Sequence, residues 1–352
     1  MKETRGDSAL GRAYVLFILV LVYTFNFIDR QIVGILAVPI KAELALNDTQ
    51  LSLMGGLAFA LFYTFLGIPI AWLADRSNRV WIMTIALSVW SAMTALCGLS
   101  QNFIQLFLAR LGVGIGEAGG VAPAYSLIAD YFPPHQRARA LSVYSFGIPI
   151  GSAMGIVLGG VLTTHLGWRA AFILVGLMGL AIAPLFRLTL AEPPRGRFDA
   201  PGTSLAPAPF AAVLRTLARK PSFWLMSLGG ACSSMMGYGL IFWLPSFFVR
   251  SFGAELPGFF AWLPRFLLPQ EPPALLYASY FYGAILLIGG VIGIWSGGAL
   301  ADYFGRARRG AYAMIPALAF LASLPFFVAG VLAPSLGVAF IAFLAIQALS
   351  LV

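Results

Sequence analysis

Long apolar runs are the feature that most restricts what this chain can fold into. A helix needs about 20 predominantly apolar residues to cross the hydrocarbon core of a bilayer, and runs of that length recur along the sequence. We place ten of them, at approximately 13–39, 51–74, 80–99, 103–129, 141–164, 170–190, 222–249, 277–301, 311–332 and 335 to the end. The sequence therefore predicts an all-α integral membrane protein.

The composition excludes a water-soluble globule. Charged residues make up only 10% of the 352 residues, and hydrophobic residues make up 60%. Soluble domains carry roughly 25% charged residues, so most of this chain must face lipid or other helices. We find no nucleophile beside a base and no residues with metal-ligand spacing. The sequence accordingly predicts no enzyme, no cofactor and no metal site.

Basic residues are distributed unevenly between the segments that connect the spans. With a cytoplasmic N-terminus, 16 of the 22 Lys and Arg residues fall on the cytoplasmic side, and two lie inside spans. The external side then holds only Lys41, Arg169, Arg250 and Arg265. Because cytoplasmic loops carry an excess of Lys and Arg, we expect a multi-pass protein with its N-terminus in the cytoplasm, in a bacterial inner membrane. The dispersed charge indicates no nucleic-acid partner.

A Pro- and Arg-rich segment divides the predicted spans into two groups. Residues 1–190 hold six spans, residues 191–221 read as a cytoplasmic linker, and residues 222–352 hold about four more. The chain stops at Val352 inside an apolar run, so we expect a C-terminal half that is truncated after about four helices.

A short repeat links the two predicted halves. The segment AWLADRSNR at 71–79 matches GALADYFGR at 298–306, which aligns Asp75 with Asp302. Both copies connect two spans on the cytoplasmic side. Repeats of six spans in the same orientation are typical of secondary transporters.

Four charged residues lie inside predicted spans. Asp29 and Arg30 belong to the first, and Arg110 and Glu117 to the fourth. At about 1.5 Å of rise per residue, Asp29 lies roughly 15 Å, Arg110 about 10 Å and Glu117 about 20 Å below the external surface. Each unpaired charge costs roughly 2.5 to 3.5 kcal/mol at mid-bilayer on insertion scales. A structural salt-bridge network is the alternative, but we favour an ion or substrate path.

The same four charges predict a coupling mechanism. A carboxyl group beside an arginine stays ionised, and burial favours its protonation once the arginine is drawn elsewhere. A solute with an anionic head that pairs with Arg30 or Arg110 would therefore couple proton binding to solute binding. Asn26, Tyr144 and Tyr238 are further candidates for the cavity lining.

Small residues form regular stripes in two of the spans. In the fifth, glycine recurs at every fourth position, at Gly147, Gly151, Gly155 and Gly159, and the eighth has a similar stripe at Gly289, Gly293 and Gly297. Such stripes let helix backbones approach closely, in a fixed interface or a moving one.

Several motifs resemble those of the major facilitator superfamily, and within it the spinster-like transporters. The wider resemblance rests on ADRSNR and its repeat ADYFGR, on DYFPPHQRARA after the fourth span and on GWRAAF before the sixth. The narrower one rests on FNFIDR in the first span and on GVGIGEAGGVAPAYSLIADYFPPHQRARALSVYSFGIPIGSAMG across the fourth and fifth.

The resemblance implies a bundle of two pseudo-repeated six-helix halves around a central cavity. Asp29 and Glu117 would respond to protons, with Arg30 and Arg110 as their partners or as substrate contacts. A cytoplasmic latch would include Asp75, Arg76 and Arg79, with Asp302 and Arg306 in the second copy. Asn78 departs from the pattern, because a glycine is usual there, whereas Gly305 keeps it.

The function that these patterns predict is secondary transport by alternating access. We expect a monomeric, proton-coupled carrier in the lipid bilayer for a small amphipathic or organic-anion solute, such as a lysolipid. Two alternatives stay open, namely efflux of cationic or neutral drugs or metabolites and a non-transporting membrane scaffold.

Overall fold

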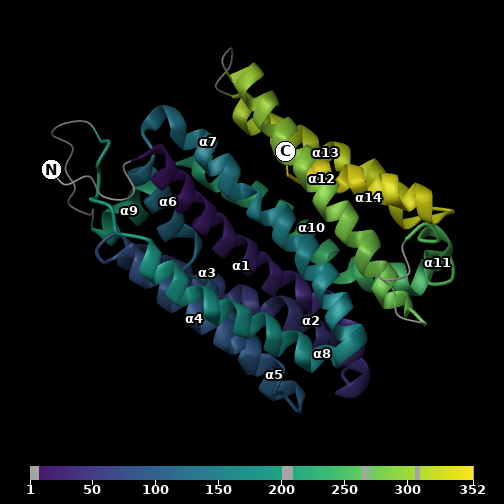
Figure 1. Cartoon of the computed structure of the whole chain (residues 1–352). Coiled ribbons are helices and arrows are strands. Elements are labelled where there is room, and N and C mark those ends of the chain that lie inside the picture. Colours follow the sequence, from purple (N-terminus) through teal and green to yellow (C-terminus); the bar gives the residue numbers. More distant parts are fainter. Residues whose placement is uncertain (1–7, 200–208, 264–267, 269–270, 306–309, 352) are drawn as a thin grey trace.

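Every regular element of the described residues is a helix (Figure 1). The structure is a computed structural model and describes residues 8–199, 209–263, 268, 271–305 and 310–351. Its first group of helices comprises α1 (Ala9–Glu43), α2 (Asp48–Ser52), the π-helix η1 (Leu53–Leu57), α3 (Ala58–Ala74), α4 (Arg79–Cys97), α5 (Phe103–Glu117), α6 (Val121–Tyr131), α7 (Pro134–Ser145) and α8 (Gly147–Thr189). The remainder are α9 (Phe210–Ala218), α10 (Pro221–Phe252), α11 (Leu256–Phe259), α12 (Ala274–Gly305), α13 (Ala311–Val331) and α14 (Leu336–Ser350).

Helix α8 contains two membrane-crossing arms joined at Gly167. This residue has φ 83° and ψ 162°, a backbone conformation that glycine adopts most readily. The arm before it packs along α1. The arm after it packs along α4 in the opposite direction, since Arg169 lies against Gly98 at the end of α4 and Gly179 lies against Ser91 further back. The predicted fifth and sixth spans are therefore both present in α8.

The ten predicted spans are accounted for in the structure. Eight helical stretches of the described residues are long and apolar enough to cross a membrane, and one of them, residues 134–189, includes both arms of α8. The shorter apolar helix α14 makes up the tenth. The predicted fourth span is divided into α5 and α6 by a turn at residues 118–120. The prediction of an all-α membrane bundle is confirmed.

The glycine stripe of α8 is a contact surface with α1. A Cβ atom at Gly151 would lie 2.3 Å from the carbonyl oxygen of Thr24, and one at Gly155 would lie 2.8 Å from that of Ile28. Real Cβ atoms do not approach so closely, so only glycine permits this spacing of the two helices. In α12, Gly293 packs in the same way against Ala348 of α14.

Helices α1 and α10 meet at a second close contact. A Cβ atom at Gly34 of α1 would lie 3.0 Å from the carbonyl oxygen of Ile241, and the ring of Phe242 lies where a Cβ atom of Gly55 would be. Gly55 belongs to η1, a π-helical turn, which is a rare element that is often found at functional sites. The predicted first and second halves are therefore in contact at Gly34 and Gly55. Gly34 lies one helical turn beyond Arg30 along α1.

The segment predicted as a linker, residues 191–221, has structure of its own. Residues 192–196 pack against the ends of α4 and α6. Helix α9 follows, with every residue partly or fully exposed, and Pro221 already begins α10.

Candidate functional site

The four predicted intramembrane charges lie on facing helices. Asp29 and Arg30 are on α1, and Arg110 and Glu117 are on α5. Asp29 and Arg110 are each 2% exposed and Glu117 is fully buried, while the Arg30 side chain is 8% exposed. The structure therefore brings all four into one buried region.

Arg30 is the best connected of the four. Its Nε donates to Oε2 of Glu117 at 2.6 Å, and one of its terminal nitrogens donates to the hydroxyl of Tyr238 in α10 at 2.7 Å. Three aromatic rings surround the guanidinium, with centroids 4.8 to 5.1 Å from its central carbon, namely Phe27, Phe59 and Tyr63. Arg30 thus joins α1, α5, α3 and α10 through ionic, hydrogen-bonding and cation–π contacts.

Asp29 and Arg110 are less completely paired. They lie close enough to interact electrostatically, but among the described residues neither has an ion pair within 4.0 Å. Trp90 and Thr94 of α4 flank the Asp29 carboxyl group. Several buried polar atoms of this region form no well-aligned hydrogen bond in the described part of the chain, including Asp29 Oδ1, Glu117 Oε1 and Arg110 Nε.

Buried polar atoms normally have a partner, so this concentration of unpaired ones needs an explanation. An unpaired buried group costs roughly 1–3 kcal/mol. The region therefore has hydrogen-bonding capacity that the described side chains leave unused.

The three other predicted cavity residues have different environments. Asn26 is buried, and its Oδ1 also lacks a partner among the described side chains. Tyr238 is 45% exposed apart from its contact with Arg30. Tyr144 is 1% exposed and stacks on Tyr23 of α1, with ring centroids 4.2 Å apart.

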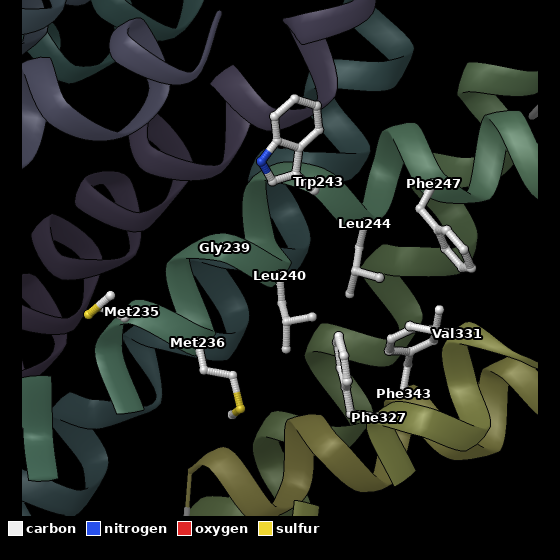
Figure 2. Close-up of a pocket in the computed structure, with 10 residues that line it drawn as sticks. All are labelled: Met235, Met236, Gly239, Leu240, Trp243, Leu244, Phe247, Phe327, Val331 and Phe343. Atoms are coloured by element: carbon white, nitrogen blue, oxygen red, sulfur yellow. The ribbon is translucent and has the colours of Figure 1, made fainter. Parts of the chain in front are cut away.

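An apolar pocket lies between α10 and the helices α13 and α14 (Figure 2). Its volume is about 370 Å³, and residues of α10, α13 and α14 line it. The lining residues are Met235, Met236, Gly239, Leu240, Trp243, Leu244, Phe247, Phe327, Val331 and Phe343. Helix α10 thus contributes Tyr238 to the charged region, and residues close to Tyr238 in the sequence line the apolar pocket.

A second arginine cluster lies where α4 begins. Arg79 is fully buried, and it donates to Asp130 at 2.5 Å and to Glu192 at 2.6 Å. Its remaining donors reach the backbone oxygens of Ser126 and Pro193 and the Ser126 hydroxyl. Every nitrogen of this guanidinium has an acceptor. We call Arg79, Asp130 and Glu192 the Arg79 cluster.

Asp75 and Arg76, two further predicted latch residues, do not join the Arg79 cluster. Asp75 is exposed, and among the described residues Arg76 bonds to the backbone oxygen of Trp72 and stacks on its ring. Asp302 lies within α12, and Arg306 lies outside the described residues.

Asn78, the departure from the usual glycine, caps α4. Its side chain accepts a hydrogen bond from the backbone N–H of Trp81 at 2.8 Å. Asparagine is among the best residues at this position of a helix, so the substitution has a structural reason.

Sequence reasoning missed several members of both clusters. Asp130 and Glu192 pair with Arg79 across 51 and 113 residues, and no local pattern specifies contacts of that range. The rings of Phe59 and Tyr63 contact the guanidinium of Arg30. Their spacing of four residues places both on one helix face, which is the sequence signal that could have identified them.

Among the described residues, no group of three or more His, Cys, Asp or Glu side chains could hold a metal ion.

Comparisons with known proteins identify the family. Residues 19–352 match the family model described as Major Facilitator Superfamily. An MFS-type efflux pump of Mycolicibacterium smegmatis is 36% identical over 239 residues, which cover 68% of this chain and 55% of that protein. Protein spinster homolog 1 of Bos taurus is 32% identical over 342 residues, which cover 93% of this chain and 61% of that protein. The chain thus spans less than two thirds of the length of these relatives.

Solved structures agree with the sequence comparisons. A bacterial homolog to the human lysosomal transporter Spinster, in an inward-facing and unoccupied conformation, superposes with a TM-score of 0.77 at 35% identity, covering 97% of this chain and 73% of that one. The inward-facing and occupied conformation gives a TM-score of 0.75 at 34% identity, covering 98% and 73%. The predicted resemblance is confirmed: this chain belongs to the Major Facilitator Superfamily, in its spinster-like group.

Proposed function

We propose that this chain works as a proton-coupled secondary transporter that moves an amphipathic organic anion by alternating access. The observation that carries the proposal is the position of Arg30, which is held by Glu117 from α5 and by Tyr238 from α10. Its three neighbouring rings and its ion pair bury a positive charge for which an anionic head group would compete with Glu117.

The competition provides the coupling. An anionic head group that pairs with Arg30 leaves the Glu117 carboxylate buried without its cation. A buried, unpaired carboxylate is costly and is neutralised by a proton. Solute binding therefore favours proton uptake at Glu117, and release of one favours release of the other. Asp29 and Arg110, which lie beside this pair without a close partner among the described side chains, would respond to the same change of charge.

The apolar pocket of Figure 2 supports an amphipathic solute. Residues 235–247 of α10 supply most of that pocket, and Tyr238 of the same segment contacts Arg30. An apolar tail in the pocket and a charged head at Arg30 would occupy both. The relatives, an MFS-type efflux pump and a bacterial homolog to a lysosomal transporter, are compatible with such solutes.

Efflux of cationic compounds is the second candidate. The partnerless Oδ1 of Asp29 and the rings of Phe59 and Tyr63 favour it, because carboxylates and aromatic faces bind cations. For either solute, we propose a monomer in a bacterial inner membrane with a cytoplasmic N-terminus, because the predicted cytoplasmic segments carry most of the basic residues.

Glu117→Gln tests the coupling. The full chain is reconstituted into liposomes that enclose a pH-sensitive dye, and a lysophospholipid or a lipophilic cation is added outside. We expect the wild-type chain to move protons on addition of the lysophospholipid, and Glu117→Gln to reduce this signal at least tenfold. Glu271→Gln, which removes an exposed carboxylate from a loop, is the matched control and should behave as the wild type.

Two outcomes would contradict the proposal. Proton movement that persists in Glu117→Gln removes this residue from the coupling. A response to the lipophilic cation without one to the lysophospholipid favours the second candidate.

A further inference from the structure

A second cavity lies where α1 and α10 end, at the end of the bundle opposite the Arg79 cluster. Its volume is about 370 Å³, which is within the range of small-molecule sites. It is lined by Val38, Lys41, Ala42, Leu46, Leu51, Ser246, Val249 and Arg250. We call it the end cavity. The residues come from α1, from α2 and the turn before it, and from α10, so the cavity joins the two predicted halves.

The rim of the end cavity is positively charged. Lys41 pairs with Asp48 at 2.6 Å, and these side chains are 33% and 61% exposed. Arg250 is exposed and has no ion pair within 4.0 Å among the described residues, although Asp48 is near enough to interact with its charge. Two cations and one carboxylate leave a net positive charge. The guanidinium of Arg250 is therefore available to an anion.

The inner wall of the end cavity is apolar. Leu46 is 6% exposed and Leu51 is 2% exposed, and Val249 completes the wall next to Arg250. A positive rim above an apolar wall complements a molecule with an anionic head and an apolar chain. A free inorganic anion would use only the rim.

The end cavity is separate from the Arg30 region. Along α1, Lys41 is 11 residues from Arg30, which corresponds to about 16 Å at 1.5 Å per residue. Between them lies the contact of α1 with α10 at Gly34 and the ring of Phe242 seated on Gly55. These contacts leave no room for a Cβ atom, so closely packed helices separate the end cavity from Arg30.

We propose that the end cavity is a second binding site, for a single-chain amphiphile with an anionic head, and that its occupant ties the end of α1 to the end of α10. The head binds Arg250 and Lys41, and the chain lies on Leu46, Leu51 and Val249. A fatty acid carboxylate and a lysolipid phosphate share this chemistry. The inference does not rest on the proposed transport, because it concerns binding alone.

Equilibrium binding to the full chain in phosphatidylcholine nanodiscs tests the proposal. The probe is radiolabelled dodecyl phosphate, and empty nanodiscs give the background. In the Arg30→Gln background, which removes the cation of the proposed central site, we expect Arg250→Gln to weaken the remaining saturable binding at least tenfold and Val249→Trp, which fills the cavity and keeps both cations, to abolish it. Arg215→Gln removes an exposed arginine of α9 and should bind as the wild type. Arg30→Gln should keep the site.

Competition identifies the head group. Unlabelled dodecanoate or dodecyl phosphate should displace the probe, and the more effective one names the preferred head. Dodecanol should compete at least tenfold less well, because it has no charge for Arg250. Inorganic phosphate at equal concentration should not compete.

Other results would overturn the site. Loss of the saturable binding in Arg30→Gln but not in Arg250→Gln assigns the probe to the central region. Equal competition by inorganic phosphate shows a simple anion site, and equal competition by dodecanol shows that charge has no role. Amide hydrogen exchange tests whether the bound amphiphile links the end of α1 to the end of α10. Dodecyl phosphate should slow exchange in residues 41–46 and 246–252 together. Protection of one segment alone contradicts such a link.

Discussion

The two buried arginine clusters of this protein solve the same problem in different ways. Arg79 is fully buried and has an acceptor for every nitrogen, including two carboxylates and two backbone oxygens. The Arg30 region is equally deep, yet it contains a terminal nitrogen of Arg30 and an oxygen each of Asp29 and Glu117 without a hydrogen-bond partner among the described residues. A saturated cluster fixes helices in place. An unsaturated one retains the capacity to bind something else.

Arg79→Gln should have the largest effect on stability. It leaves the carboxylates of Asp130 and Glu192 without their cation, and breaking a buried pair costs about 3 to 5 kcal/mol. We expect a large fall in the midpoint of thermal unfolding of the detergent-solubilised chain. Arg215→Gln is the control for loss of one positive charge. A midpoint close to that of the wild type would mean that the cluster does not fix the helices.

Arg195→Gln should have a smaller effect at the same end. One terminal nitrogen of Arg195 donates to the backbone oxygens of Ala74 at 2.6 Å and Ser77 at 2.5 Å, the first being the last residue of α3 and the second lying in the turn after it. Hydrogen bonds from charged donors contribute about 1.5–3 kcal/mol each, and partial exposure to water reduces the loss here to roughly 2 kcal/mol. The same unfolding measurement checks the ranking, which fails if this variant is less stable than Arg79→Gln.

Tyr238→Phe should lower the free energy of unfolding by less than Arg195→Gln does. It removes the acceptor that Arg30 uses in α10, and Tyr238 is 45% exposed, so a loss of about 1 kcal/mol is expected. Tyr303→Phe, at an exposed tyrosine of α12, is the matched control. An unfolding midpoint lowered as much as in Arg195→Gln would show that the link between α1 and α10 is a main source of stability.

Asp29→Asn should change stability least and gives the sharpest contrast. Asp29 lacks a close ion pair among the described side chains, so neutralising it removes a poorly compensated buried charge and is expected to be neutral or stabilising. Asp130→Asn, the matched change in the Arg79 cluster, should be destabilising because Arg79 loses a partner. The comparison of the clusters would be wrong if both variants shifted the unfolding midpoint in the same direction by similar amounts.

The membrane fold was predictable from the sequence because the bilayer imposes a length rule on each helix. The first predicted span, 13–39, falls within α1, and the seventh, 222–249, falls within α10. The turn that separates α5 from α6 was not predictable, because the apolar pattern continues through it. The reversal of α8 at Gly167 was placed correctly by the gap between the predicted fifth and sixth spans.

The candidate site was predictable in its charges but not in its partners. Charged residues inside apolar runs are conspicuous, so the position of four of them within predicted spans was enough to identify Asp29, Arg30, Arg110 and Glu117. The pairing of Arg30 with Glu117 rather than Arg110 with Glu117, and the contact with Tyr238 across 208 residues, depend on how helices rotate against each other. Arg79 was placed in a predicted latch from its motif, and its burial between Asp130 and Glu192 depends on contacts of the same long range.

The π-helical turn η1 gives the aromatic wall around Arg30 an adjustable register. A π-helix holds more residues per turn than an α-helix, and in an α-helix each residue turns the chain by about 100°. Phe59 and Tyr63 follow η1 in α3, so a return of Leu53–Leu57 to α-helical geometry would rotate both rings away from Arg30. The Phe242 ring of α10, which is seated on Gly55, therefore lies against the turn that sets the direction of both rings.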